Sequence, residues 1–277
     1  MVAALCALGA SLAWGVGDFL GGLKSREVPL LLVLMLSQVS GLIGIGLVVA
    51  VAGNAPPDAA VLWAPVAAVF GTLGLAAFYR GMAVGSISVV APIAAVAAVV
   101  PVTFGIATGD DVSPLQLVGF ALALVGVALA SLERDHMGAT TVASGVPWAL
   151  VAVVGFGGYY IPMHEASGED FLWAAFVFRA SVALFALVAW IVLRPPLAQA
   201  RGHLTAIVLV GLADTAGNTL FAAAANQGAV SVVSVLATLY PVTTIVLAAI
   251  VLDERVRRTQ RLGIAAALAG VVLISAG

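Results

Sequence analysis

Charged side chains are scarce in this 277-residue chain: Asp, Glu, Lys and Arg make up 9% of it, and hydrophobic residues make up 63%. Soluble domains contain about 25% charged residues, and no water-soluble fold could cover so much apolar surface. Uncharged runs recur that are long enough to cross a bilayer as helices. These runs lack the two-residue alternation of membrane strands, so the sequence predicts an all-α membrane protein.

Cysteine and the common catalytic motifs are also missing. The single cysteine, Cys6, excludes an internal disulfide and a cysteine metal site. The sequence contains no G-x-S-x-G, no H-E-x-x-H, no P-loop and no paired Asp-rich motif. We therefore expect no enzyme active site, no metal, no cofactor and no nucleic-acid partner. An intramembrane enzyme is the least favoured function, and ATP-driven transport by this chain alone is excluded.

The apolar runs predict ten membrane-spanning helices joined by short connections. The first residues carry no basic segment, so we expect them to form the first span rather than a cleaved signal peptide. The predicted spans are residues 2–21, 29–52, 61–83, 86–107, 114–132, 143–162, 171–193, 204–225, 229–251 and 260–276.

An internal repeat divides these spans into two sets of five. The stretch from Gly228 to Gly277 matches the stretch from Gly85 to Ser131 at an offset of 143 or 144 residues. Both stretches have a Ser-Val-Val, a proline, an acidic loop, a Gln and a Gly-Val-rich end. We predict two five-helix repeats, residues 1–134 and 140–277. Because five is odd, the second repeat should enter the membrane in the opposite sense, as an inverted repeat.

Basic residues predict the orientation. They lie in the connections that follow odd-numbered spans, whereas acidic residues occupy the even-numbered connections. The protein is expected in the inner membrane of the cell. By the positive-inside rule, the odd connections are cytoplasmic and both termini lie on the outer side. The basic residues are Lys24, Arg26, Arg134, Arg194, Arg201, Arg255, Arg257, Arg258 and Arg261.

Four ionised residues fall inside predicted spans. Their depths permit two pairs, which we state as hypotheses: Arg179 with Asp214 near the midplane, and Asp18 with Arg80 near the cytoplasmic ends of their helices. Such residues persist in a bilayer when they are paired or face water. The first pair could form the floor of a substrate cavity and the second a gate, but both could also be structural pairs. A proton-carrying role for Asp214 is a further alternative.

Other polar and aromatic residues are candidates for the same cavity. Asn218 lies one helical turn from Asp214, and Thr215 lies beside it. An aromatic residue in a membrane helix more often serves packing or anchoring than substrate contact, so these are hypotheses. The full set of predicted cavity residues is Asp214, Arg179, Asn218, Thr215, Tyr240, Trp14, Gln38, Tyr79 and Tyr160.

Prolines predict interrupted helices at matching places in the two repeats. Pro92 and Pro101 lie in the fourth span, and Pro241 lies in the ninth. A proline leaves a helix carbonyl without its usual partner and can break a helix at membrane depth. Matching breaks in two repeats indicate a transport site, although simple kinks remain an alternative.

The stretch 234–274 resembles the EamA family of the drug/metabolite transporter superfamily. The pattern is an apolar run with Pro241, a second run ending in Glu254 and Arg255, then Gln260 and the glycines Gly263 and Gly270. The first repeat departs from it, with an Asp-Asp pair where Glu-Arg is expected. The resemblance implies ten helices around a central cavity lined by spans 1, 3, 4, 6, 8 and 9, with contributions from 2 and 7.

The resulting hypothesis is a secondary transporter of small polar or amphipathic metabolites, such as amino acids. It would work by alternating access around a midplane cavity, with export slightly favoured over import. Its partners would be a small-molecule substrate, the lipid bilayer and, as one option, a proton or other coupling ion. It would be a monomer or a homodimer. The alternative is a non-transporting structural or regulatory membrane subunit, or a lipid-handling scaffold.

Overall fold

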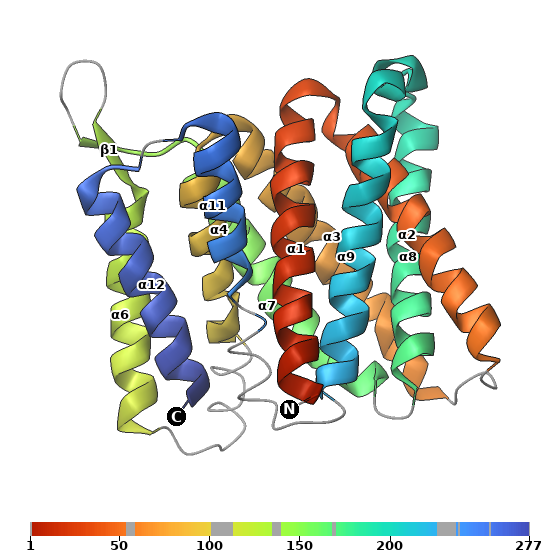
Figure 1. Cartoon of the computed structure of the whole chain (residues 1–277), viewed down its shortest axis with the longest axis horizontal. Coiled ribbons are helices and arrows are strands. Elements are labelled where there is room, and N and C mark those ends of the chain that lie inside the picture. Colours follow the sequence, from red (N-terminus) through yellow and green to blue (C-terminus); the bar gives the residue numbers. More distant parts are fainter. Residues whose placement is uncertain are drawn as a thin grey trace.

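The protein is a bundle of helices (Figure 1). Its structure, a computed structural model, describes residues 2–53, 59–100, 113–134, 140–167, 170–225, 237, 239–254 and 256–276. The α-helices in these residues are α1 (Val2–Glu27), α2 (Leu30–Ala52), α3 (Trp63–Val84), α4 (Ile87–Ala95), α6 (Pro114–Ser131), α7 (Val146–Ala166), α8 (Phe171–Leu193), α9 (Leu204–Ala225), α11 (Tyr240–Leu252) and α12 (Arg258–Ala276).

Each predicted span overlaps one of these helices. Six helices are long and apolar enough to cross a membrane: α1, α2, α3, α7, α8 and α9. The helix α4 passes into a 3-10 turn, η2 (Val96–Ala98), and two further 3-10 segments are η1 (Ala59–Leu62) and η3 (Leu197–His203). Residues 101–107 of the fourth span and most of the first half of the ninth lie outside the described residues. The described chain is therefore helical, as predicted.

A short β-hairpin that the sequence did not predict joins the two halves. The strands β1 (Leu132–Arg134) and β2 (Thr140–Val142) pair in antiparallel register, with Glu133 opposite Thr141. They connect α6 to α7 at the upper edge of the bundle in Figure 1, whereas both chain ends lie at the lower edge. The helix α1 therefore begins at the lower edge and α7 at the upper one.

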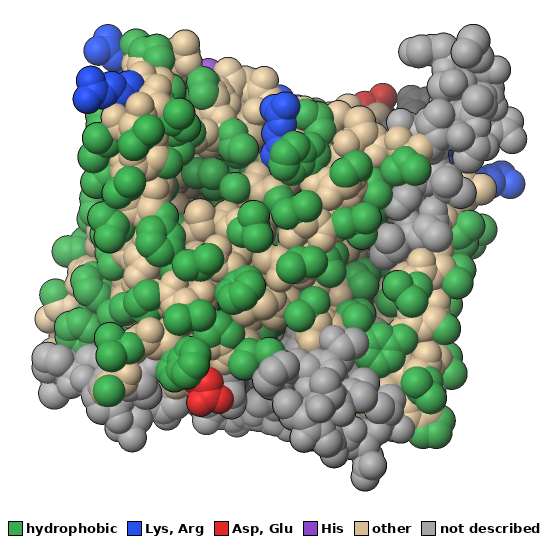
Figure 2. All heavy atoms as spheres, turned by 180° about the vertical axis from the view of Figure 1, so that it is seen from behind, with side chains coloured by type: hydrophobic (Ala, Val, Ile, Leu, Met, Phe, Trp, Pro, Cys, Tyr) green, Lys and Arg blue, Asp and Glu red, His purple; other side chains and the backbone are tan. Residues whose placement is uncertain are grey.

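Side chains on the outside of the bundle are mainly apolar, as expected for a surface that faces lipid. Val51, Ile250 and Leu193 are 88%, 75% and 71% exposed. Figure 2 shows hydrophobic side chains across the middle of one face, with the visible Lys and Arg at the upper part. Buried polar residues instead lie inside, among them Gln38 and Arg179. Polar inside and apolar outside is the arrangement that hydrocarbon favours.

Local sequence sets where several helices begin. Asp170 caps α8, because its carboxylate accepts hydrogen bonds from the backbone N–H groups of Leu172 and Trp173. At the start of α6, the Ser113 hydroxyl accepts from the N–H of Gln116, and the Gln116 side chain accepts from the N–H of Ser113. The Gln260 side chain accepts from the N–H of Arg257 in the same way at the start of α12. The repeated glutamine is thus a helix-start signal.

The main helix contacts connect the first half of the chain with the second. The helix α6 packs on α12, α3 on α7, α1 on α9, and α2 on both α8 and α9. Smaller contacts join α1 to α11, and α4 to both α7 and α11. In Figure 1, α6 and α12 stand together at one end of the bundle, and α2 and α8 stand at the other. The two halves therefore interlock rather than forming separate bundles.

Glycines allow close approaches between helices, for example between α3 and α7. A Cβ atom on Gly155 would lie 2.4 Å from the backbone of Gly74, and one on Gly74 would lie 2.6 Å from the Phe156 ring. Both distances are too short for real atoms. Small residues therefore let the two backbones pack directly.

We predict that Gly155→Ala destabilises the protein by about 1–3 kcal/mol, because a methyl group against backbone must push the helices apart. Thermal unfolding in detergent would measure this. Gly46→Ala is the matched control, because its new Cβ would lie at an ordinary 3.5 Å from Phe176. Equal unfolding temperatures for the two variants would contradict the prediction.

Candidate functional site

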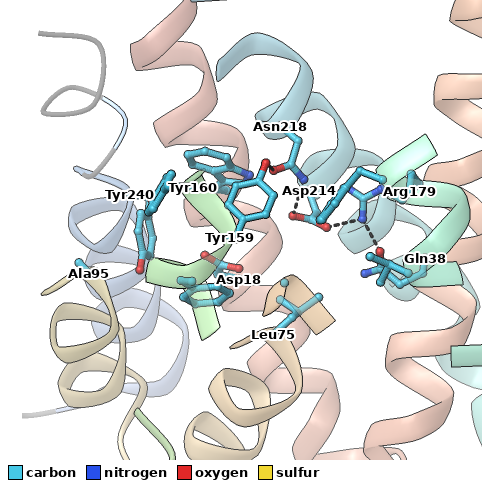
Figure 3. A pocket seen from close by; sticks show the side chains of 15 residues that line it. Asp18, Gln38, Leu75, Ala95, Tyr159, Tyr160, Arg179, Asp214, Asn218 and Tyr240 are labelled. Atoms are coloured by element: carbon cyan, nitrogen blue, oxygen red, sulfur yellow. Dashed lines mark hydrogen bonds and ion pairs between the residues drawn. The ribbon is translucent and has the colours of Figure 1, made fainter. Parts of the chain in front are cut away.

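A cavity in the centre of the bundle receives side chains from both halves of the chain (Figure 3). Most of its lining is aromatic or polar, and the lining comes from α1, α2, α3, α4, α7, α8, α9 and α11. The residues are Trp14, Asp18, Gln38, Gly71, Leu75, Ala95, Phe156, Tyr159, Tyr160, Phe178, Arg179, Val182, Asp214, Asn218 and Tyr240.

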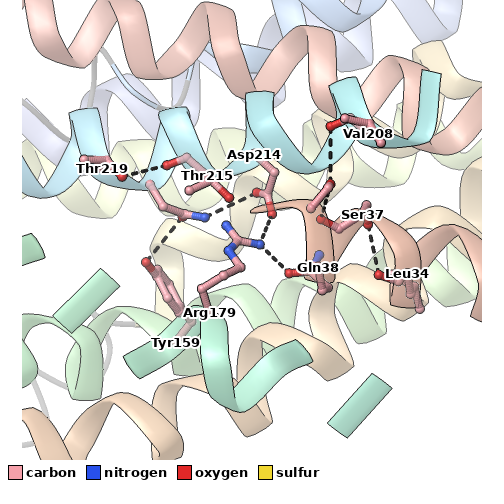
Figure 4. Close-up of polar contacts among 11 residues, drawn as sticks. Leu34, Ser37, Gln38, Tyr159, Arg179, Val208, Asp214, Thr215 and Thr219 are labelled. Carbon is pink, nitrogen blue, oxygen red and sulfur yellow. Dashed lines mark hydrogen bonds and ion pairs between the residues drawn. The ribbon is translucent and has the colours of Figure 1, made fainter. Parts of the chain in front are cut away.

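A polar network occupies one side of this cavity. The guanidinium of Arg179, which is 1% exposed, lies 2.6 Å from the Asp214 carboxylate and also donates a hydrogen bond to the Gln38 side-chain oxygen. Asn218 donates to the other Asp214 oxygen at 3.3 Å, and Tyr159 lies 3.5 Å from the Asn218 oxygen. Figure 4 shows these contacts joining α2, α7, α8 and α9. The predicted pairing of Arg179 with Asp214 is present.

Part of this network is left without partners. Among the described residues, nothing accepts a hydrogen bond from Nε or Nη2 of Arg179, or from Nε2 of Gln38. The Phe178 ring instead covers the guanidinium, with its centroid 5.7 Å from the Arg179 Cζ. Buried donors without acceptors are unfavourable, so this side of the cavity retains unused capacity to bind oxygen atoms.

The predicted pair of Asp18 with Arg80 is not formed. Asp18 is buried, 8% exposed, and lines the cavity. Arg80 lies on the exposed face of α3 and forms no ion pair among the described residues. Depth alone put the two residues together, but their helical faces point apart. Arg80 lies one turn from the end of α3, where a long cationic side chain can reach the membrane surface.

Aromatic rings form the other walls and, with Phe78 and Phe221 behind them, make a continuous series of contacts. Trp14 packs on Phe221 and on Tyr240, with ring centroids 5.7 and 6.5 Å apart. The series continues at centroid distances of 5.1 to 6.5 Å. Its members, in order, are Phe156, Phe78, Tyr240, Trp14, Phe221, Tyr160, Tyr159 and Phe178.

Two predicted cavity residues pack beside the cavity rather than lining it. Thr215 lies between α9 and α2, and its hydroxyl would be 2.3 Å from a Cβ on Gly41. Tyr79 covers Gly21 of α1, and its hydroxyl has no hydrogen-bond partner among the described residues. Thr215 was a candidate because it follows Asp214, but it lies on another face of α9. Tyr79 was a candidate as an aromatic residue in a span, and it packs on α1 instead.

Sequence reasoning missed several lining residues, including Tyr159, Phe156, Phe178 and Leu75. Apolar and aromatic residues are common on every face of a membrane helix, so composition gives no signal for them. Spacing could have helped for two: Phe178 precedes Arg179, and Leu75 is the repeat position of Asn218, 143 residues earlier.

The prolines lie close to the cavity. Pro92 is buried in α4, three residues before Ala95 at the cavity and just before the helix changes to a 3-10 turn. Pro241 occupies the first turn of α11, next to Tyr240, where a missing N–H is tolerated. Pro101 lies outside the described residues.

A second ion pair, which sequence reasoning did not identify, closes the edge of the bundle that carries the basic residues. The Arg26 guanidinium contacts Glu254 at 3.2 Å and donates to the carbonyls of Met82 and Gly85 at the end of α3. The Glu254 carboxylate accepts from the N–H groups of Ile87 and Ser88 at the start of α4. A carboxylate at a helix N-terminus is favoured by the helix dipole.

Hydrogen bonds also keep this carboxylate charged. Burial raises the pKa of Glu254, but the bonds from Ser88, Ser86 and Ile87 outweigh that effect and leave the pKa below its usual value of 4.5. Glu254 follows α11, and its partners are Arg26 of α1, Ser86 just before α4, and the first residues of α4. The contact therefore ties the second half of the chain to the first.

The chain belongs to the EamA-like transporter family, whose model matches residues 1–132 and again residues 143–276. No curated protein sequence matches it. A solved crystal structure, described only as that of a protein, aligns with 98% of this chain and 95% of its own at a TM-score of 0.66. Its sequence identity is 16%, so that likeness concerns the fold alone. The protein is thus a multi-pass membrane protein of a transporter family.

We predict that Arg179→Gln and Asp214→Asn each destabilise the protein by about 3–5 kcal/mol, because each leaves a buried partner uncompensated. The double variant should lose much less than the sum of the two. Unfolding by denaturant in detergent would measure all three. Additive losses would mean that the two side chains do not act as a pair.

Proposed function

We propose that this protein is a secondary transporter of small polar or amphipathic metabolites, with amino acids among the candidates and export favoured over import. The observation that carries the proposal is the central cavity, in which Arg179 and Asp214 of the second half pair and Arg179 also binds Gln38 of the first half. The unused donors of Arg179 and Gln38 suit substrate oxygens. Membership of a transporter family supports the same conclusion, whereas a scaffold would have no use for a polar cavity at this depth.

We further infer that the halves are inverted repeats related by a pseudo-two-fold axis. Contacts at equivalent positions support this. A Cβ on Gly74 would meet Phe156, and one on Gly217 would meet Trp14. Likewise, Gly126 faces Ala267. The equivalent contact in the other repeat is Gly270 facing Ala123, because Gly270 lies 144 positions after Gly126 and Ala267 lies 144 positions after Ala123. Swapping the two repeats in the same way turns the packing of α1 on α9 into the packing of α7 on α3.

Alternating access requires that one side close while the other opens. In this structure the basic edge is closed in two layers. The outer layer is the contact of Arg26 with Glu254. The inner layer consists of Tyr79 and Met82 against α1, where Cβ atoms on Gly21 and Gly22 would lie 2.2 and 2.8 Å from them. Both layers separate Asp18 and the cavity from the basic edge.

The basic edge would face the cytoplasm of a cell whose inner membrane holds the protein. The connections α1–α2, α8–α9 and α11–α12 and the hairpin carry the basic residues, and all lie at one edge in Figure 1. The positive-inside rule then places both termini outside. On this orientation, the structure is closed toward the cytoplasm.

Transport in reconstituted vesicles tests the function. We expect a panel of amino acids and related metabolites, with and without a pH gradient, to identify a substrate whose flux is abolished by Asp214→Asn and by Arg179→Gln. Both variants should still insert, as checked by yield and size-exclusion profile. Exposed Arg80→Gln serves as the control and should retain flux. Wild-type flux in both cavity variants would remove these residues from the transport site.

The contact of Arg26 with Glu254 gives a prediction about gating. Glu254→Gln should loosen the closed basic edge, so that a cysteine introduced at Ser88 reacts faster with a thiol reagent, in a background with Cys6→Ala. Because the folded-state pKa of Glu254 is lowered, its stabilisation is present above its usual value of 4.5 and is lost as the pH falls through the lower folded value. Labelling of the parent should therefore stay slow at neutral pH. Equal rates with and without Glu254→Gln would contradict the gate.

A further inference from the structure

Asp18 is a cavity carboxylate that the described part of the chain does not neutralise. It is 8% exposed and lines the cavity, yet none of the described residues forms an ion pair or hydrogen bond with it. Asp214, in contrast, has Arg179 at 2.6 Å. A buried carboxylate without a positive partner is strongly unfavourable inside a membrane. Its persistence is explained if a cation that is not part of the described protein binds there.

The neighbouring contacts show from which side such a cation would come. Beyond Asp18 on α1, the Tyr79 ring and Met82 pack directly on Gly21 and Gly22 and close the route to the basic edge. In Figure 3 the Asp18 carboxylate instead lies in the cavity between Tyr240 and Leu75, apart from Gln38. The site is therefore accessible from the cavity that substrate would occupy.

The surroundings of Asp18 suit an organic cation rather than a hydrated ion. Trp14 lies one turn before it on the same helix, and the Trp14 and Tyr240 rings meet at 82°. Phe156 and Tyr159 line the same cavity. Ring faces attract ammonium groups, and they offer none of the oxygen ligands that a small metal ion needs.

The two repeats carry different side chains at equivalent positions of the cavity. The polar network therefore lies on the second-half side, and the part of the cavity near Asp18 differs from it. The second half places Asp214 and Asn218 in the cavity, and the positions 143 residues earlier hold Gly71 and Leu75. Gly71 and Leu75 give the cavity an apolar part on the first-half side. A molecule with a cationic head and an apolar body fits an acidic group next to such a wall.

We propose that Asp18, with the aromatic rings of Trp14 and Tyr240, forms a subsite for the cationic head of an amphipathic organic amine. The body of the amine would pack on Leu75, Ala95 and Phe156. This proposal rests on the proposed transport function, because the subsite belongs to the same cavity, and it narrows the substrate to a class that carries a positive charge.

Binding to the purified full-length protein in detergent tests the subsite, using three probes of one shape. These are 2-phenylethylamine, which is cationic at neutral pH, uncharged 2-phenylethanol and anionic 3-phenylpropionate. Calorimetry should show that the amine binds at least about tenfold more tightly than the alcohol, the least expected for a desolvated charge pair. Asp18→Asn should abolish that difference, and Asp18→Glu should keep most of it. Glu27→Gln, at an exposed carboxylate, is the control and should change nothing.

Several results would overturn the subsite. The amine could bind no better than the alcohol, the anion could bind best, or Asp18→Asn could leave the preference unchanged. Displacement of the amine by Na⁺ but not by choline at equal ionic strength would assign the site to an inorganic ion instead. Should Asp18→Asn not purify as a folded protein, the order of the three probes on the unmutated chain decides.

The same probes separate this proposal from the transport function. Amine binding that depends on Asp18, without flux of any substrate in vesicles, would leave the subsite standing and remove the proposed transport. Flux of an anionic substrate that is unaffected by Asp18→Asn would leave transport standing and remove the subsite.

Discussion

The contact between Arg179 and Asp214 is the interaction on which the interior of this protein depends. Either residue alone would be an uncompensated charge among apolar helices. Together they hold α8 against α9, while Gln38 holds α8 against α2. Because the pair is formed within one half and completed by the other, the cavity exists only when both halves are assembled. The pair also makes the cavity polar at a depth where lipid-facing surfaces cannot be.

The cavity has nearly symmetric positions and asymmetric chemistry. Gln38 and Arg179, which hydrogen-bond to each other, occupy equivalent places in α2 and α8, each eight residues beyond the helix start. Trp14 and Phe156 are equivalent by their contacts, since Trp14 packs on Gly217 and Phe156 packs on Gly74. Repetition of a fold thus sets where side chains point, and divergence of the two copies supplies different groups. A substrate with unlike ends can be bound in one orientation by such a site.

Helix positions could be predicted from the sequence because hydropathy depends on composition, which survives any rotation of a helix about its axis. Site residues depend on that rotation. The pairing of Arg179 with Asp214 was predicted correctly because both charges are unfavourable in lipid and they have opposite signs. Arg80 was misplaced since depth says nothing of the face it occupies, and Thr215 because a neighbour in sequence lies about 100° away on a helix. The ion pair of Arg26 with Glu254 joins residues 228 positions apart, and no local pattern could connect them.

The interlocking of the two halves has a consequence for biogenesis. The helices α1, α2, α3, α4 and α6 leave the ribosome first, and each has its main partner in the part of the chain still to be made. Until those partners are made, the glycine-rich interfaces of the early helices and Gln38 must contact lipid, the insertion machinery or one another. The last partner, α12, completes the contact with α6 only at the end of synthesis. The two halves can therefore pack together only as the second half is made, and the early helices are the stage at which quality control would act.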